Sequence, residues 1–123
     1  MLNKPRVLLV EDQPDLREVI GSALAEHGVD VVLAEDGRCA EALIGEDENF
    51  DVVFSDIEMP NGVSGIALAE TVATRLPHAQ MILASGYARS QLPPLPANVT
   101  FLSKPYRLKQ LIALFTAVTR EKP

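Results

Sequence analysis

Short apolar runs alternate along the chain with stretches whose apolar residues recur at helical spacing. The run from Arg6 to Val10 is continuous and β-branched, as expected for a strand that is buried on both faces of a parallel sheet. From Asp15 to His27 the apolar positions recur every three or four residues instead, which predicts an amphipathic helix. The alternation continues through the chain. It predicts strands at 6–10, 30–34, 51–55, 80–84 and 99–103, and helices at 15–27, 37–44, 63–75 and 107–119.

Several residues mark where the predicted helices begin and end. Asp15, with Glu18 three residues later, fits a capping box at the start of the first helix. Gly28 follows that helix, where a left-handed residue commonly ends one. Asp36 is expected to cap the second helix, since aspartate is among the preferred N-cap residues.

The segment after the fourth predicted strand departs from this pattern. It contains Pro93, Pro94 and Pro96, and a proline inside a helix costs about 3 kcal/mol because it removes a backbone hydrogen bond. We therefore expect at most one turn, around residues 88–91, so that the fourth helix is short or distorted. The other strands and helices predict an α/β fold with a parallel sheet between two layers of helices and right-handed crossovers.

Composition narrows the class of protein. The 123 residues fit one domain, which we expect to span residues 1–123. The 17 acidic and 11 basic residues give a net charge of −6, which argues against direct binding of nucleic acid. The single cysteine, Cys39, excludes an intramolecular disulfide and a thiolate metal cage. Apolar runs are too short for a membrane span and the N-terminus lacks a signal peptide, so we expect a cytoplasmic protein that does not bind membranes.

Reactive or charged side chains follow the predicted strands at 6–10, 51–55, 80–84 and 99–103. Taken singly, such residues are commonly turn, cap or surface residues. Parallel strands, however, all end at one edge of the sheet, which is where open α/β sheets bind ligands. The side chains that we expect to share a site there are Glu11 and Asp12 after 6–10, Asp56 after 51–55, Ser85 after 80–84, and Lys104 after 99–103.

These side chains together suit phosphoryl transfer. Carboxylates at close range raise one another's pKa values, and a divalent cation removes the conflict. Oxygen ligands without histidine or thiolate favour Mg²⁺, which typically binds one or two carboxylates and a phosphate oxygen. The Lys104 ammonium and the Ser85 hydroxyl can each take a further oxygen of the transferring group. Asp56 is then the expected nucleophile.

The chain resembles the receiver domains of two-component response regulators over nearly its whole length. The resemblance lies in Glu11-Asp12, in DVVFSDIEMP at 51–60, in Ser85-Gly86 and in Lys104-Pro105. It implies a flavodoxin-like (βα)5 three-layer sandwich with a five-stranded parallel sheet of order 2-1-3-4-5. It also implies a signalling domain that catalyses only its own phosphorylation and dephosphorylation. Its partners would be a histidine kinase or histidine phosphotransfer protein and a downstream protein target, and formation of a homodimer stays open.

The resemblance further implies a role for each site residue. Asp56 would be the phosphoacceptor. Mg²⁺ would be held by Glu11 and Asp12, by Asp56, and by the backbone carbonyl of Glu58. Glu11 stands where aspartate is more usual, and Glu58 adds a carboxylate beside the acceptor. We hypothesise that Glu58 changes the dephosphorylation rate by holding or repelling the attacking water.

The same resemblance implies a conformational switch. Ser85 would move toward the phosphoryl group, and Phe101 would turn inward, with Tyr87 as the competing aromatic. Lys104 would contact the phosphoryl group, and its peptide bond to Pro105 would be cis. Two departures from the usual pattern are the proline-rich fourth segment and the loop at 61–65, which is one residue longer than is typical.

Other functions fit the residues less well. A haloacid-dehalogenase-like phosphatase also uses an aspartyl nucleophile, but it needs a second aspartate where this chain has Glu58. A flavodoxin-like cofactor binder needs a glycine-rich phosphate loop where Glu11 and Asp12 would repel phosphate. A receiver-like module that is never phosphorylated would not need the complete set of site residues. A receiver that forms part of a hybrid histidine kinase remains open.

Overall fold

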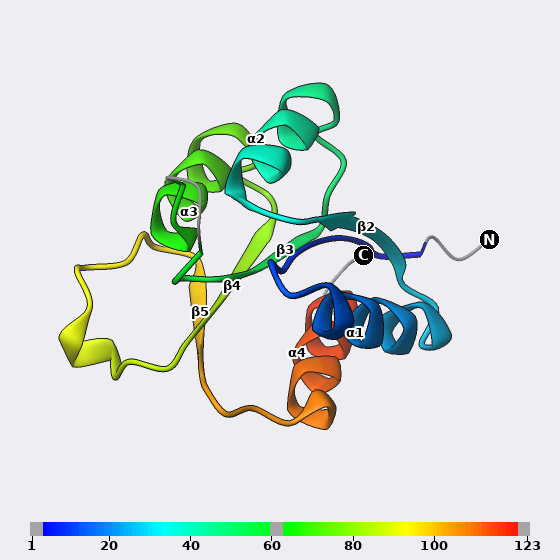
Figure 1. Ribbon diagram of the computed structural model, residues 1–123. Helices are drawn as coiled ribbons and strands as arrows, with labels where there is room; N and C mark the ends of the chain where they lie inside the picture. Colours follow the sequence, from blue (N-terminus) through cyan, green and yellow to red (C-terminus); the bar gives the residue numbers. More distant parts are fainter. Residues whose placement is uncertain (1–3, 60–62, 121–123) are drawn as a thin grey trace.

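The computed structural model describes residues 4–59 and 63–120, which form one parallel five-stranded sheet with its helices (Figure 1). The sheet order is β2-β1-β3-β4-β5, as the resemblance implies. All neighbouring strands pair in parallel register. The strands are β1 (Arg6–Val10), β2 (Asp30–Ala34), β3 (Val52–Asp56), β4 (Gln80–Ser85) and β5 (Val99–Ser103).

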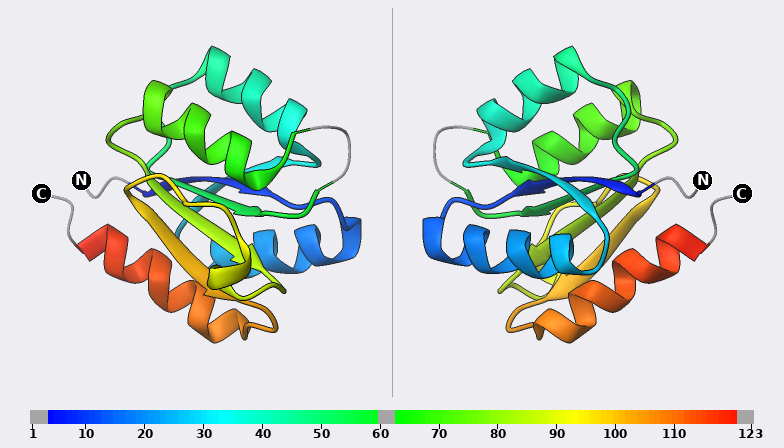
Figure 2. Two further views of the ribbon diagram at one scale, coloured as in Figure 1. Left: turned by 90° about the vertical axis from the view of Figure 1, so that its left-hand side faces the viewer. Right: turned by 90° about the vertical axis from the view of Figure 1, so that its right-hand side faces the viewer.

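The helices cover both faces of the sheet, which confirms the three-layer sandwich (Figure 2). One layer holds α1 (Pro14–Glu26) and α4 (Leu108–Arg120), and the opposite layer holds α2 (Gly37–Glu46) and α3 (Gly65–Arg75). Because sequential parallel strands need a crossover, α1, α2 and α3 each return the chain to the amino end of the next strand. In the described part of the chain, no helix has the length and apolarity that a membrane span requires.

The fourth helical position holds only the single 3₁₀ turn η1 (Arg89–Gln91), which confirms the expected short fourth helix. The chain then runs to β5 as an irregular segment at the edge of the sheet (Figure 1, yellow). Leu92 and Leu95 are half-buried and pack against the core beneath α2 and α3. Asn98 has a φ of 60°, a left-handed conformation that asparagine tolerates better than most residues.

Two apolar clusters hold the layers together, one on each face of the sheet. Successive residues of β3 point to opposite faces, so Val53 lies in the cluster beneath α2 and α3 and Phe54 in the cluster beneath α1 and α4. The Phe54 ring makes edge-on contacts with Tyr106 and Phe115, at centroid distances of 5.9 and 6.3 Å. Every residue of β3 is buried, so the strand that ends at Asp56 is held rigidly from both sides.

The predicted ends of the helices are partly right. Asp36 Oδ1 accepts a hydrogen bond from the Cys39 backbone N–H at 2.8 Å, which confirms the cap of α2. Gly28 follows α1 with a φ of 80°, as expected. The capping box at Asp15 is wrong, because α1 begins one residue earlier at Pro14. Proline suits the first helical position, where its missing N–H would have no helical partner, and Asp15 therefore lies within the first turn.

The third helix begins later than predicted, at Gly65 rather than Val63. Ser64 is the N-cap, and its Oγ accepts from the Ala67 backbone N–H at 3.1 Å. A serine cap competes effectively for the start of a helix because it satisfies a free backbone donor. Part of the loop at 61–65, which is one residue longer than is typical, lies outside the described residues.

Candidate functional site

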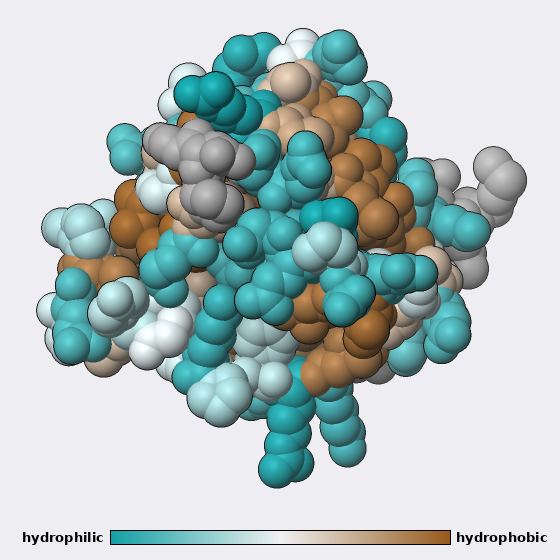
Figure 3. Space-filling model, viewed as in Figure 1, coloured by the Kyte–Doolittle hydropathy of each residue, from teal (hydrophilic) through white to brown (hydrophobic). Residues whose placement is uncertain are grey.

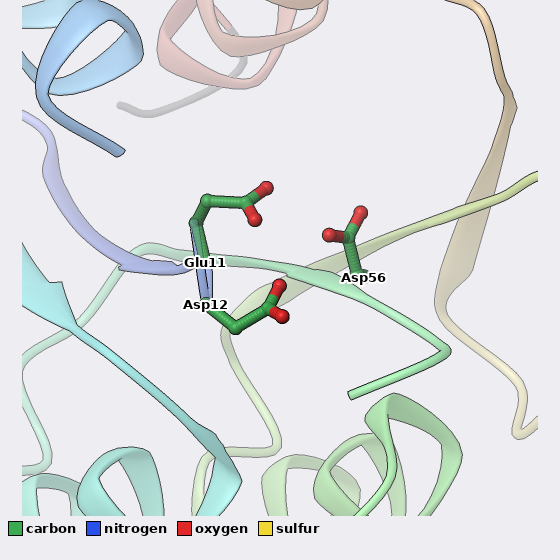
Figure 4. A group of neighbouring side chains, drawn as sticks. All are labelled: Glu11, Asp12 and Asp56. Carbon is green, nitrogen blue, oxygen red and sulfur yellow. The ribbon is translucent and has the colours of Figure 1, made fainter. Parts of the chain in front are cut away.

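Three carboxylates converge at the carboxyl ends of β1 and β3. Glu11 and Asp12 directly follow β1, and Asp56 is the last residue of β3. Each offers one oxygen, and these oxygens all lie within 4.8 Å of one another. Figure 4 shows the three side chains directed into a common space. Figure 3 shows hydrophilic residues across the centre of this face of the molecule.

The local backbone holds Glu11 in place. The Glu11 backbone N–H donates to the Ala34 carbonyl at 3.0 Å, which continues the β1–β2 pairing by one step. The Glu11 carbonyl accepts from the Arg17 guanidinium at 2.9 Å. The Gln13 backbone N–H donates to Glu11 Oε2 at 3.1 Å. The Glu11 backbone is therefore held from β2 and from α1, and its side chain is held by the N–H of its own turn.

The Glu11 carboxyl is in an unfavourable place for a charge. Only 1% of the residue is exposed, and burial raises the pKa of its carboxyl to about 7. The Gln13 N–H acts in the opposite direction, and the negative charge of Asp56 raises the pKa further. Glu11 Oε1 is buried without a hydrogen-bond partner among the described residues. An unpaired buried oxygen beside two further carboxylates fits a cation ligand.

The donor set matches a small hard cation. All three groups are carboxylates, and Mg²⁺ prefers oxygen ligands over the nitrogen and sulfur ligands of zinc sites. Asp56 is 3% exposed and Asp12 is half-buried, so the cluster opens to solvent on the Asp12 side. The residues present therefore fit a divalent metal of this class.

Lys104 supplies a positive charge to the same cluster. Its Nζ lies 2.9 Å from Asp56 Oδ1, and its backbone N–H donates to the Ser85 carbonyl at 2.8 Å. Burial acts to lower the pKa of the Lys104 ammonium. The hydrogen bond that the ammonium donates to Asp56, together with the charges of Asp56, Glu11 and Glu58, outweighs burial and raises this pKa overall. The Lys104–Pro105 peptide bond is cis, as expected.

Ser85, the last residue of β4, is completely buried beside Asp56. The Ile57 backbone N–H donates to the Ala84 carbonyl at 2.9 Å, so the ends of β3 and β4 stay paired at the site. Ser85 Oγ donates to Glu58 Oε2 at 2.8 Å and accepts from the Tyr87 backbone N–H at 3.0 Å. The sequence placed these residues at one edge of the sheet, but it did not predict the contact between Ser85 and the Glu58 side chain.

The two candidate aromatic switch residues differ in burial. Phe101 lies on β5 opposite Leu83 of β4, is half-buried and packs against the core beneath α2 and α3. Tyr87 is 56% exposed. The structure thus gives the location of each ring, and their switching roles stay predictions, as does the role of the Glu58 carbonyl.

Gly65 also shapes the site, although sequence reasoning assigned it no function. A Cβ at this position would lie 2.2 Å from the Asp56 carbonyl oxygen and 2.8 Å from Ile57 Cα. The Gly65 backbone N–H donates to the Ile57 carbonyl at 2.9 Å. The start of α3 can therefore contact the backbone of the Asp56 turn only because residue 65 lacks a side chain. A glycine directly after the Ser64 cap was the available signal.

Tyr106 is the second residue that sequence reasoning missed. It follows Pro105 and stacks edge-on against Phe54. Its hydroxyl is buried without a hydrogen-bond partner among the described residues. Burial raises the pKa of this hydroxyl, and the charges of Asp56 and Glu11 raise it further, so the group stays neutral. Together with Leu16 and the Lys104-Pro105 pair, Tyr106 lines an apolar depression beside the carboxylates.

Comparison with known proteins identifies relatives of this chain that match it over most of its length. The family model of the response regulator receiver domain matches residues 7–116. The response regulator receiver protein CpdR of Brucella abortus is 33% identical over 110 residues, which cover 87% of this chain and 90% of CpdR. The response regulator PilR of Pseudomonas aeruginosa is 31% identical over 128 residues, which cover 99% of this chain but only 28% of PilR.

Solved structures agree with this match. The receiver domain of the hybrid histidine kinase CckA has a TM-score of 0.80 and is 31% identical, with 93% of this chain and 98% of that chain covered. The response regulator TrrA of Thermotoga maritima, solved in complex with Mg²⁺-BeF, has the same TM-score, identity and coverage.

Proposed function

This chain belongs to the response regulator receiver domain family of two-component signalling, and we propose that Asp56 is the residue on which it is phosphorylated. The observation that carries the proposal is the position of the Asp56 carboxylate. Asp56 is 3% exposed, and its Oδ1 lies 2.9 Å from Lys104 Nζ. One of its carboxylate oxygens lies within 4.8 Å of an oxygen of Glu11 and an oxygen of Asp12. No other described carboxylate combines a buried position with this set of neighbours.

The chemistry follows from these positions. An Asp56 carboxylate oxygen attacks the phosphorus of a phosphohistidine, and the phosphorus–nitrogen bond breaks with its electron pair left on the donor's imidazole. The transferring group spreads negative charge over its equatorial oxygens. The Lys104 ammonium is placed to hold one of these oxygens, and Ser85 Oγ, once free of Glu58, can donate to another.

Glu11, Asp12, the Asp56 carboxylate and the Glu58 carbonyl would hold Mg²⁺, which when bound supplies positive charge against the phosphoryl oxygens. The buried Glu11 carboxyl with its unpaired oxygen supports this assignment. TrrA, which binds Mg²⁺-BeF in its structure, resembles this chain over 93% of its length. The residues of this chain position the carboxylates and exclude water from the side of the site that faces the core.

Receiver domains as a class act in signalling between histidine kinases or phosphotransfer proteins and downstream targets. For this chain we propose a histidine kinase or histidine phosphotransfer protein as donor and a protein as target. Phosphorylation would draw Ser85 toward Asp56, which Lys104 already contacts, and alter the surface around Phe101 or Tyr87. CpdR and the CckA receiver resemble the chain to a similar degree, so membership of a hybrid kinase is not better supported.

Intact-mass spectrometry after incubation with acetyl phosphate and Mg²⁺ tests the proposal. We expect the wild type to gain one phosphoryl group and Asp56→Asn to gain none. Asp30→Asn is the matched control, because Asp30 is an exposed carboxylate at the opposite end of the sheet, at the start of β2. Equal modification of wild type and Asp56→Asn would show that the acceptor is elsewhere.

A further inference from the structure

The Ser85 hydroxyl has a complete set of partners in this structure. A serine hydroxyl has one proton to donate, and that proton is given to Glu58 Oε2 at 2.8 Å. In the other direction Ser85 Oγ accepts from the Tyr87 backbone N–H at 3.0 Å. Ser85 is 0% exposed, so water does not reach the Ser85 hydroxyl itself. Ser85 therefore cannot donate to a phosphoryl oxygen on Asp56 without giving up Glu58.

We propose that Glu58 is a positioning residue that holds Ser85 in the resting orientation and competes with the phosphoryl group for the Ser85 proton. The inference rests on the proposed phosphorylation of Asp56. It concerns the Glu58 side chain, whereas the metal site would use only its backbone carbonyl. The contact joins the turn after β3 to the last residue of β4, which are the two segments that must rearrange.

Charge explains how the contact is released. A phosphoryl group on Asp56 adds about −1.5 to −2 of charge two residues from Glu58. The Glu58 charge already acts on the Lys104 ammonium, whose pKa it helps to raise, so the carboxylate lies close enough to respond. Glu58 is an exposed residue, and its carboxylate can turn to water at little cost. Ser85, which is buried, then finds its nearest acceptor in the phosphoryl oxygens.

The contact also reaches Tyr87. Because Ser85 Oγ accepts from the Tyr87 backbone N–H, a turn of the Ser85 side chain weakens the bond that fixes the start of the segment leading to η1. Between β4 and β5 the chain holds only the single turn η1, so little regular structure opposes a displacement of the first residues of this segment. Loss of the Glu58 contact should therefore weaken the hydrogen bond of the Tyr87 amide even when no phosphoryl group is present.

A double-mutant cycle with the full chain tests the proposal. Wild type, Glu58→Ala, Ser85→Ala and the double variant are titrated with beryllofluoride in saturating Mg²⁺, and binding is followed by NMR of the backbone amides. A hydrogen bond to a charged group suggests that Glu58→Ala tightens binding about tenfold in the Ser85 background. In the Ser85→Ala background we expect a clearly smaller gain, since only electrostatic repulsion between Glu58 and the mimic remains.

Glu58→Gln separates hydrogen bonding from charge, because glutamine keeps an acceptor oxygen and loses the negative charge. We expect Glu58→Gln to tighten beryllofluoride binding less than Glu58→Ala does.

A second readout, the Tyr87 backbone amide, needs neither metal nor phosphate mimic. In EDTA, Glu58→Ala should shift the Tyr87 amide resonance and speed its hydrogen exchange, whereas Glu48→Ala, at an exposed glutamate outside the site, should leave both unchanged.

The outcomes separate the two proposals. Gains from Glu58→Ala that are equal in the Ser85 and Ser85→Ala backgrounds would overturn the inference while leaving phosphorylation of Asp56 intact. An unchanged Tyr87 amide in metal-free Glu58→Ala would do the same. If the wild type neither binds beryllofluoride nor gains a phosphoryl group from acetyl phosphate, the proposed function falls and this inference falls with it.

Discussion

Replacing Glu11 with glutamine should stabilise the metal-free protein, and the gain should depend on pH. Glutamine has nearly the same shape, and its side-chain oxygen can still accept from the Gln13 backbone N–H. The substitution removes the negative charge of the Glu11 carboxylate, and burial of that charge destabilises the folded state. The usual carboxyl pKa is 4.5, and in the folded protein that of Glu11 is about 7. The folded state therefore retains a proton that the unfolded state loses between these two values.

The size of the effect follows from the two pKa values. Each pH unit between them is worth about 1.4 kcal/mol, so the wild type loses about 3 kcal/mol of stability once the pH is well above 7. At pH 5 the unfolded carboxyl has only begun to ionise, and the loss is about 1 kcal/mol. Below the unfolded value both states are protonated and the penalty disappears. Glu11→Gln carries no such penalty at any of these pH values.

Urea unfolding in EDTA at pH 5 and pH 8.5 measures the difference. We expect the advantage of Glu11→Gln in the free energy of unfolding to grow by about 2 kcal/mol between the two conditions. Addition of Mg²⁺ at pH 8.5 should stabilise the wild type more than the variant, because the metal binds the carboxylate that the variant lacks. An advantage that is the same at both pH values would refute the reasoning, since it would then arise from packing rather than from the Glu11 charge.

Three further substitutions test the structure. Gly65→Ala should destabilise the fold by about 1–3 kcal/mol and slow phosphorylation by acetyl phosphate, because the new Cβ would press on the Asp56 turn. Thermal unfolding measures the loss of stability, and mass spectrometry measures the rate of phosphorylation. An unchanged rate would contradict the close approach of residue 65 to the Asp56 turn. Asp36→Ala should cost about 1 kcal/mol through loss of the α2 cap, seen in urea unfolding, without changing the phosphorylation rate. Tyr106→Phe removes a hydroxyl that has no partner among the described residues, so the urea midpoint should stay the same or rise; a loss above about 1 kcal/mol would reveal a missed hydrogen bond.

The sequence alone was sufficient for the order and type of the main elements. Continuous β-branched runs such as that at β1 are buried on both faces, and the helical segments between them have a different period, so the two are distinguishable without tertiary information. The proline cluster at 93–96 likewise precludes a regular fourth helix whatever the surroundings, because proline lacks the backbone donor. The convergence of Glu11, Asp56 and Lys104 follows from the same logic, since parallel strands end at a common edge.

Tertiary structure decided what the side chains at that edge do. The raised pKa of Glu11 depends on burial of its carboxyl in the folded protein, and the Glu58–Ser85 hydrogen bond depends on the distance between the ends of β3 and β4. The need for glycine at 65 arises because the start of α3 packs against the Asp56 turn. Spacing along a chain fixes which backbone positions come together, but burial, rotamer choice and the pairing of polar atoms depend on neighbours from remote segments, and only the folded arrangement specifies these.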